Sequence, residues 1–179
     1  MRTDADLWRG LRARARALGA CVAIVASLAV IAPLCPAQSL VGKAAPVFAR
    51  RDLDGHSIDL RKQRGKVVLL NFWATWCAPC QAEIPVFDAW QRKYGPQGLV
   101  VIGISMDDDE ATARRLADKL KLAYPIAMGD ARLGGRYGKI LGLPKTFLIG
   151  RDGVVLAEYK GETDLKAIEE RVQAALTKE

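Results

Sequence analysis

Two runs of apolar residues stand out along the chain. The first covers residues 66–73 (KVVLLNFW) and the second covers residues 99–105 (LVVIGIS). A strand with one face in water alternates apolar and polar residues, whereas a strand that is covered on both faces is almost continuously apolar. Both runs therefore predict buried strands of a sheet.

A helix is predicted between these strands, over residues 78–94. Ile84, Phe87 and Trp90 recur at a spacing of three, so they share one face that we expect to lie against the core. Pro85 stands inside this segment and predicts a kink, because proline removes a helical hydrogen bond.

Further helices are predicted in the second half of the chain. The aspartates at positions 107–109 precede one of them, where the helix dipole favours negative charge. A short helix is expected within residues 131–140, and the last helix should start near Asp164, an N-cap residue. The residues expected to face inward are Ala113, Leu116, Ala117 and Leu120 in the first of these helices, and Leu165, Ile168, Val172 and Leu176 in the last.

The remaining strands are predicted to form two hairpins and one short strand. Residues 47–60 predict a hairpin around Asp54-Gly55, a common turn pair. Residues 146–149 and 154–159 predict a second hairpin, and residues 124–128 predict a short strand. The order of these elements gives an α/β fold: a mixed central sheet in a three-layer sandwich, with helices on both faces.

The N-terminal segment has the pattern of an export signal. Residues 17–34 (ALGACVAIVASLAVIAPL) carry no charge and follow five arginines. We predict that residues 1–37 are a signal peptide or membrane anchor and that residues 38–179 are the folded domain. The domain is then expected outside the cytoplasm, in the periplasm or an equivalent compartment, with residues 17–34 as a possible inner-membrane anchor.

Composition and charge exclude several classes of protein. The chain has 179 residues, of which 50% are hydrophobic and 26% charged, so it is neither disordered nor of low complexity. Five arginines and two aspartates among residues 1–37 supply +3 of the net charge of +7. The densest bases of the remaining chain lie at positions 50–51 and 61–66 and have no aromatic residues interleaved for base stacking, so we expect no nucleic-acid partner. No glycine-rich phosphate loop is present.

The cysteines carry the candidate chemistry. Cys77 and Cys80 are the two cysteines of the predicted domain, and they stand two residues apart at the start of a predicted helix. The helix N-terminus stabilises a thiolate, so Cys77 is predicted to be the nucleophile and Cys80 the thiol that resolves the mixed disulfide. A structural zinc site needs four ligands, and the single histidine, His56, lies in a predicted turn. We therefore expect no metal and no cofactor.

The segment NFWATWCAPC, with the following QAEIP, resembles the active site of the thioredoxin superfamily, and GLPKTFLI (142–149) resembles its cis-proline loop. The chain is most similar to the TlpA/ResA-like thiol–disulfide oxidoreductases, with an insertion (106–130) ahead of the cis-proline segment. The resemblance implies a thioredoxin-like fold in which Pro144 is the cis residue. The implied substrate groove consists of Trp76, Ala78, Pro79, Leu143 and Pro144.

Glu83 is a candidate third catalytic residue. Asn71 occupies the place where cytoplasmic thioredoxins carry a buried aspartate, and it cannot titrate. Glu83 stands three residues after Cys80, where the TlpA/ResA-like family carries a glutamate. If burial raises its pKa, it can move the proton of Cys80. The alternative is an ordinary exposed glutamate on a helix.

The predicted function is the reduction of protein disulfides by a monomeric domain. In the family the usual clients are apocytochrome c or copper-site cysteines, and a thiol–disulfide donor in the membrane supplies electrons. Two alternatives remain open. A peroxiredoxin-like peroxidase needs a threonine where this chain has Ala74, and a copper chaperone needs ligands such as His56, Met106 or Met128 beside the cysteines.

Overall fold

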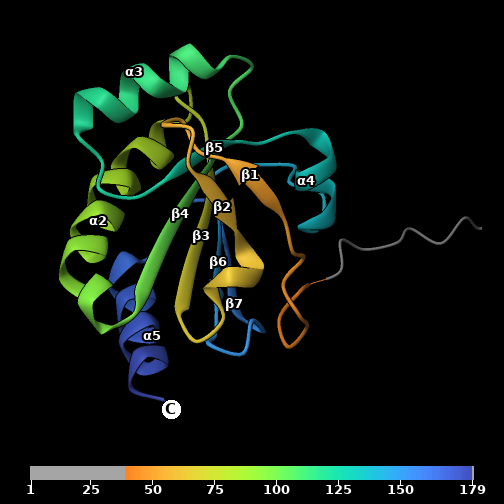
Figure 1. Cartoon of the computed structure of the whole chain (residues 1–179), viewed down its shortest axis with the longest axis vertical. Coiled ribbons are helices and arrows are strands. Elements are labelled where there is room, and N and C mark those ends of the chain that lie inside the picture. Colours follow the sequence, from red (N-terminus) through yellow and green to blue (C-terminus); the bar gives the residue numbers. More distant parts are fainter. Residues whose placement is uncertain (1–38, 179) are drawn as a thin grey trace, which may run out of the picture. The chain divides into compact units, whose positions relative to one another are not determined.

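The computed structural model describes residues 39–178, which form a five-stranded mixed sheet with a separate two-stranded hairpin (Figure 1). The strand order in the sheet is β5-β4-β3-β6-β7. β3 is parallel to β4 and antiparallel to β6, while β4 is parallel to β5 and β6 is antiparallel to β7. The strands are β1 (Ala49–Arg51), β2 (Ser57–Asp59), β3 (Val67–Trp73), β4 (Leu99–Ser105), β5 (Ile126–Met128), β6 (Lys145–Ile149) and β7 (Val155–Lys160).

The helices cover both faces of this sheet, as the sequence predicts. α2 and α5 pack on one face, and the β1–β2 hairpin and α4 pack on the other (Figure 1). The helices are α2 (Ala78–Tyr94), α3 (Glu110–Leu120), α4 (Ala131–Arg136) and α5 (Leu165–Thr177). Short 3-10 turns occupy Leu60–Gln63 and Gly95–Gln97. The fold class is confirmed.

Helix boundaries follow their capping residues. Asp109 accepts the amide of Thr112 at the start of α3, and Asp164 accepts the amide of Lys166 at the start of α5. In α5, Ile168 and Val172 are buried as predicted. In α3 the prediction for Leu120 was wrong: its side chain is 36% exposed, because it lies in the last turn of a helix at the sheet's edge.

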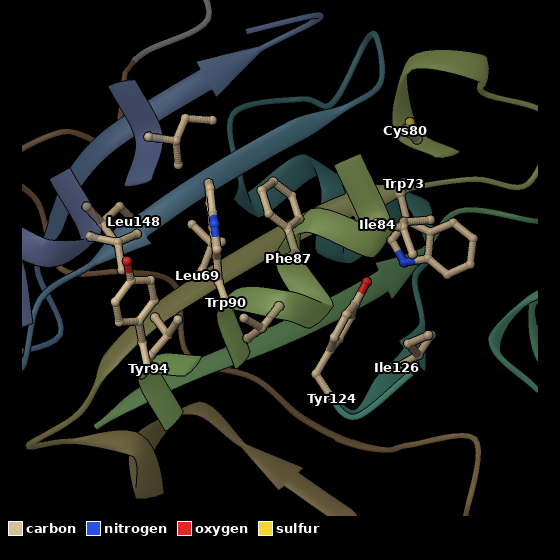
Figure 2. Close-up of a cluster of buried hydrophobic side chains, with 14 of the residues drawn as sticks. Leu69, Trp73, Cys80, Ile84, Phe87, Trp90, Tyr94, Tyr124, Ile126 and Leu148 are labelled. Atoms are coloured by element: carbon tan, nitrogen blue, oxygen red, sulfur yellow. The ribbon is translucent and has the colours of Figure 1, made fainter. Parts of the chain in front are cut away.

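Aromatic side chains from α2 fill the core between that helix and the sheet. Figure 2 shows Phe87 and Trp90 of α2 against the strands, with Trp73 at the end of β3. All seven residues of β3 are buried, and Trp73 and Trp90 both belong to the core. The packing of these buried side chains holds the end of β3 in place, and the chain continues from there into α2.

Gly103 is a position in β4 where a side chain does not fit. A Cβ atom there would lie 2.9 Å from Nε1 of Trp73, 3.1 Å from Cγ1 of Ile126 and 3.2 Å from Cε2 of Tyr124. Figure 2 shows these three side chains together at one end of the cluster. The glycine therefore allows a close approach between the sheet and its aromatic layer.

We expect Gly103→Ala to lower the free energy of unfolding by about 2 kcal/mol, because overpacking forces neighbours away from their preferred rotamers. Urea unfolding monitored by tryptophan fluorescence measures the change. Gly135→Ala in α4 is the control, since a Cβ there meets nothing within 4 Å. A Gly103→Ala protein as stable as the Gly135→Ala protein would contradict the packing account.

The predicted leader lies outside the described residues. Within residues 39–178, no helix is both long enough and apolar enough to cross a membrane.

Candidate active site

The cysteine pair lies at the carboxyl end of the parallel strands β3 and β4. Trp73 is the last residue of β3 and pairs with Ser105, the last residue of β4. Residues 74–76 then turn the chain into α2, whose N-cap is Cys77. The amide of Cys77 donates to the carbonyl of Ala74 at 3.2 Å, which closes this turn. Ligand and catalytic groups of open α/β sheets commonly lie at this edge.

Cys77 and Cys80 form a disulfide with an S–S distance of 2.03 Å, so the structure brings the predicted redox pair together. Sγ of Cys77 also accepts the amide of Cys80 at 3.3 Å. Because helix N-termini present free amide groups and the positive end of the dipole, this position stabilises a thiolate at Cys77 after reduction. Cys77 is 5% exposed and Cys80 is 1% exposed. The first sulfur is therefore the more accessible of the two.

The predicted groove residues differ in their exposure. Trp76 is 71% exposed, Ala78 is exposed and Pro79 is half-buried beside the disulfide. The Leu143–Pro144 peptide bond is cis, as the resemblance implied. Leu143 is half-buried and packs against the core cluster that contains both cysteines.

The cis-proline segment is held by the loop after β7. The carbonyl of Pro144 accepts the amide of Gly161 at 2.9 Å. Gly161 has a φ of +72°, a left-handed conformation that glycine adopts without strain. Glu162 follows it directly, so an exposed carboxylate stands beside the cis-proline segment.

Glu83 is buried within α2, one helical turn past Cys80. It is 5% exposed, and its Oε2 atom has no hydrogen-bond partner among residues 39–178. Burial, together with the negative charge of Glu162, raises the pKa of Glu83 to about 7. A carboxyl group with such a pKa can both accept and donate a proton near neutral pH. The exposed-glutamate alternative is therefore wrong for this helix.

Asn71 lies on the same face of the sheet as the core that packs beneath α2. Its Nδ2 donates to Oγ1 of Thr146 at 2.9 Å, and the two residues are paired between β3 and β6. Asn71 is thus a buried, neutral polar group whose side chain is hydrogen-bonded. Glu83 is the buried carboxyl group that follows the cysteine pair in α2.

One polar contact at the site was not expected from the sequence. Asp107 does not contribute to the start of α3, where Asp109 is the cap, but accepts hydrogen bonds from Thr75 in the turn before Cys77. The available signal was its place two residues beyond the end of a buried strand, which brings it to the edge where the cysteines lie.

The fold and the disulfide define a thioredoxin-fold thiol–disulfide oxidoreductase. The AhpC/TSA family model matches residues 41–158. Thiol-disulfide oxidoreductase ResA of Bacillus thuringiensis subsp. konkukian is 38% identical over 133 residues, covering 73% of this chain and 75% of that protein. The chain belongs to the AhpC/TSA family of the thioredoxin superfamily and, within it, to the ResA-like thiol–disulfide oxidoreductases.

Two further similarities agree with this assignment. Thioredoxin-like protein YneN of Bacillus subtilis is 32% identical over 134 residues, covering 73% of this chain and 78% of that protein. The crystal structure of a protein assigned as thiol:disulfide interchange protein DsbE from Chlorobium tepidum superposes with a TM-score of 0.72 at 31% identity. That match covers 78% of this chain and 99% of the other.

Proposed function

We propose that this protein reduces disulfides of client proteins outside the cytoplasm. The observation that carries the proposal is the Cys77–Cys80 disulfide followed, one helical turn later, by the buried carboxyl of Glu83. The residues between the cysteines, Ala78 and Pro79, carry no positive charge that would favour an oxidant. Apocytochrome c and the cysteines of copper sites are the proposed clients.

The proposed reaction begins with the reduced pair. The Cys77 thiolate attacks one sulfur of the client disulfide, forms a mixed disulfide and displaces the first client thiolate. The Glu83 carboxylate then takes the proton of the Cys80 thiol, and the resulting thiolate attacks Sγ of Cys77. This step forms the Cys77–Cys80 disulfide and releases the second client thiolate, which takes up a proton. Two electrons have passed from the protein to the client.

The groove residues hold the client segment during this exchange. Trp76 offers an exposed ring beside Cys77, and Leu143 lies in the cis-proline segment next to the same core. An extended client peptide pairing with the backbone there is held as an added strand. A dithiol protein in the membrane is the proposed electron donor that reduces the disulfide again.

The location and the redox state are tested together in intact cells. We expect a membrane-impermeant maleimide to label Cys77 in spheroplasts that express the full chain with Cys21→Ser and Cys35→Ser. Acid quenching before labelling should show the pair mainly as the dithiol when a membrane donor is present. Labelling that requires lysis would contradict the proposed location, and a pair that stays fully oxidised would contradict the direction of electron flow.

The peroxidase and copper-chaperone alternatives are tested on the same protein. Ala74 is fully buried at the position where a peroxidase needs a threonine. Within residues 39–178, no three histidine, cysteine, aspartate or glutamate side chains are grouped so that they could hold a metal ion. Turnover of hydrogen peroxide, or copper bound tightly by the reduced pair, would replace the proposed reductase function.

A further inference from the structure

Asp107 makes a dense set of hydrogen bonds immediately beside the active-site turn. Its Oδ1 accepts the hydroxyl of Thr75 at 2.7 Å and the amide of Thr75 at 3.0 Å. Its Oδ2 lies 3.1 Å from the same amide and accepts the hydroxyl of Ser105 at 2.8 Å. Asp107 is only 8% exposed, so these bonds replace most of its contact with water.

The register of β3 and β4 brings the Asp107 carboxylate next to the turn before Cys77. Because Trp73 and Ser105 end β3 and β4 as a pair, the two chains leave the sheet side by side. The amide of Met106 donates to the carbonyl of Trp73 at 2.7 Å, which joins them just beyond the strands. Asp107 then reaches Thr75 across this narrow gap.

Thr75 is also held from the side of α2. Nε2 of Gln81 donates to the carbonyl of Thr75 at 2.5 Å. The amide and hydroxyl of Thr75 both donate to Asp107 and its carbonyl accepts from Gln81, so all three polar groups are paired, with partners from two segments. The peptide that leads to Cys77 is thereby fixed in one orientation.

The charge of Asp107 has no nearby counter-charge. Among residues 39–178, no lysine, arginine or histidine nitrogen lies within 4 Å of its oxygens. Thr75 precedes Cys77 by two residues, so their Cα atoms are at most about 7 Å apart. Asp107 is hydrogen-bonded to this turn and is largely shielded from water, so its negative charge opposes the formation of a thiolate at Cys77. It acts against the helix N-terminus, which favours one.

We infer that Asp107 is a positioning residue for thiol–disulfide exchange, which fixes the turn before Cys77 and disfavours the Cys77 thiolate, so that the pair is a stronger reductant than its helix position alone would make it. A thiolate that is less stable makes the reduced state less stable relative to the disulfide. The inference rests on the exchange chemistry of the cysteine pair and not on the identity of the client.

Other charged or titratable groups near Cys77 also influence the stability of its thiolate. On α2 the titratable neighbours are Cys80 and Glu83, and the turn after β4 adds the exposed Asp108. After the cis-proline, the first charged residue is Lys145, whose ammonium group is paired with Glu158 on β7, and the exposed carboxylate of Glu162 stands beside the same segment. None of these side chains bonds to Thr75.

The test is Asp107→Asn in the full chain with Cys21→Ser and Cys35→Ser. Asparagine keeps the shape and one acceptor oxygen but removes the charge. We expect alkylation of Cys77 by iodoacetamide at pH 6.5 to become about three- to tenfold faster. The equilibrium constant with glutathione at pH 8.5 should move toward the dithiol by a similar factor. This second shift should shrink at pH 5.5, where both proteins hold the thiol protonated.

Asp108→Asn is the matched control, since it removes the same charge from an exposed neighbour without a hydrogen bond to Thr75. Its effect should stay under about twofold, because solvent screens an exposed charge. Thr75→Val keeps the charge but removes the hydroxyl bond, and it should lower kcat/KM for a disulfide substrate; Thr75→Ser should restore it.

Three results would overturn the inference. They are equal effects of Asp107→Asn and Asp108→Asn, an effect of Asp107→Asn that does not depend on pH, and a Thr75→Val protein with unchanged kcat/KM. Near-ultraviolet circular dichroism of each variant confirms that the disulfide form is folded. Alkylation of Cys77 needs no client, so these results are independent of whether the proposed client reduction holds.

Discussion

Replacing Cys77 with serine is expected to reduce the turnover of a disulfide substrate by more than about 1000-fold. The hydroxyl of serine is not ionised near neutral pH and cannot form the mixed disulfide, so the first step is lost. Cys80→Ser should also stop turnover, but for a different reason. Its Cys77 thiolate still attacks the substrate, and the mixed disulfide then accumulates because no second sulfur resolves it. Cys77 is the more exposed of the two cysteines and caps the helix N-terminus, which predicts this order.

The measurement is the reduction of a fluorescent disulfide peptide, together with gel electrophoresis without reductant. Both variants are made with Cys21→Ser and Cys35→Ser, and that parent protein is the control. A mixed disulfide should appear with Cys80→Ser and be absent with Cys77→Ser. The opposite pattern would show that Cys80 is the nucleophile and would reverse the proposed roles.

Glu83→Gln is expected to remove a large pH dependence of stability. In the unfolded chain this glutamate has its ordinary pKa of 4.5, whereas burial and the charge of Glu162 raise its folded pKa to about 7. Between these values the native state keeps a proton that the unfolded state has lost. Its contribution to stability is therefore fully present below pH 4.5 and is lost as the pH rises through 7. The shift corresponds to about 3 kcal/mol.

Urea unfolding at pH 4 and pH 8, with the disulfide intact, measures this contribution. The free energy of unfolding of Glu83→Gln, minus that of the parent, should rise by about 3 kcal/mol from the lower to the higher pH. Glu170→Gln, at an exposed position on α5, is the control. Its free energy of unfolding relative to the parent should be the same at pH 4 and pH 8. A flat difference for Glu83→Gln would mean that Glu83 is not buried as an unpaired carboxyl.

The same variant tests the proposed proton transfer. Glutamine cannot accept the proton of Cys80, so we expect client reduction at pH 7 to fall about 100-fold. The pH profile of the parent should show a group that titrates near 7, and this feature should be absent from the variant. Unchanged rates and an unchanged profile would remove Glu83 from the mechanism and leave it a structural residue.

Most of the fold could be predicted because strong local patterns agree with the tertiary structure. The largely apolar run at 66–73 became β3 (Val67–Trp73), in which every residue is buried. α2 begins and ends at the predicted residues, since Cys77 caps its start and Gly95 follows its end. The Asp54-Gly55 turn became the β1–β2 hairpin, where Gly55 has a φ of +85°. Each of these signals lies within a few residues of the element it determines.

The rest depended on contacts between segments that are distant in the sequence. Leu120 has helical spacing with Ala113, but it is the last residue of α3 and remains exposed. From the sequence, Asp107 is expected at a helix N-terminus. The register of β3 and β4 instead places it beside Thr75, and this register is not evident from the local sequence. For Glu83, the sequence left both a buried and an exposed position open. Tertiary packing made the choice, because it buries the Glu83 side chain and brings the charge of Glu162 near it, which helical spacing does not reveal.

The midpoint potential of the Cys77–Cys80 couple tests the central claim most directly. It is measured on the full chain with Cys21→Ser and Cys35→Ser, by equilibration with glutathione or dithiothreitol buffers at pH 7. A value near or below about −220 mV, in the range of thioredoxin and glutaredoxins, is the result that a reductase of client disulfides predicts. A value near about −120 mV, like that of a strong periplasmic oxidant, would contradict it, because the pair would then insert disulfides into its clients.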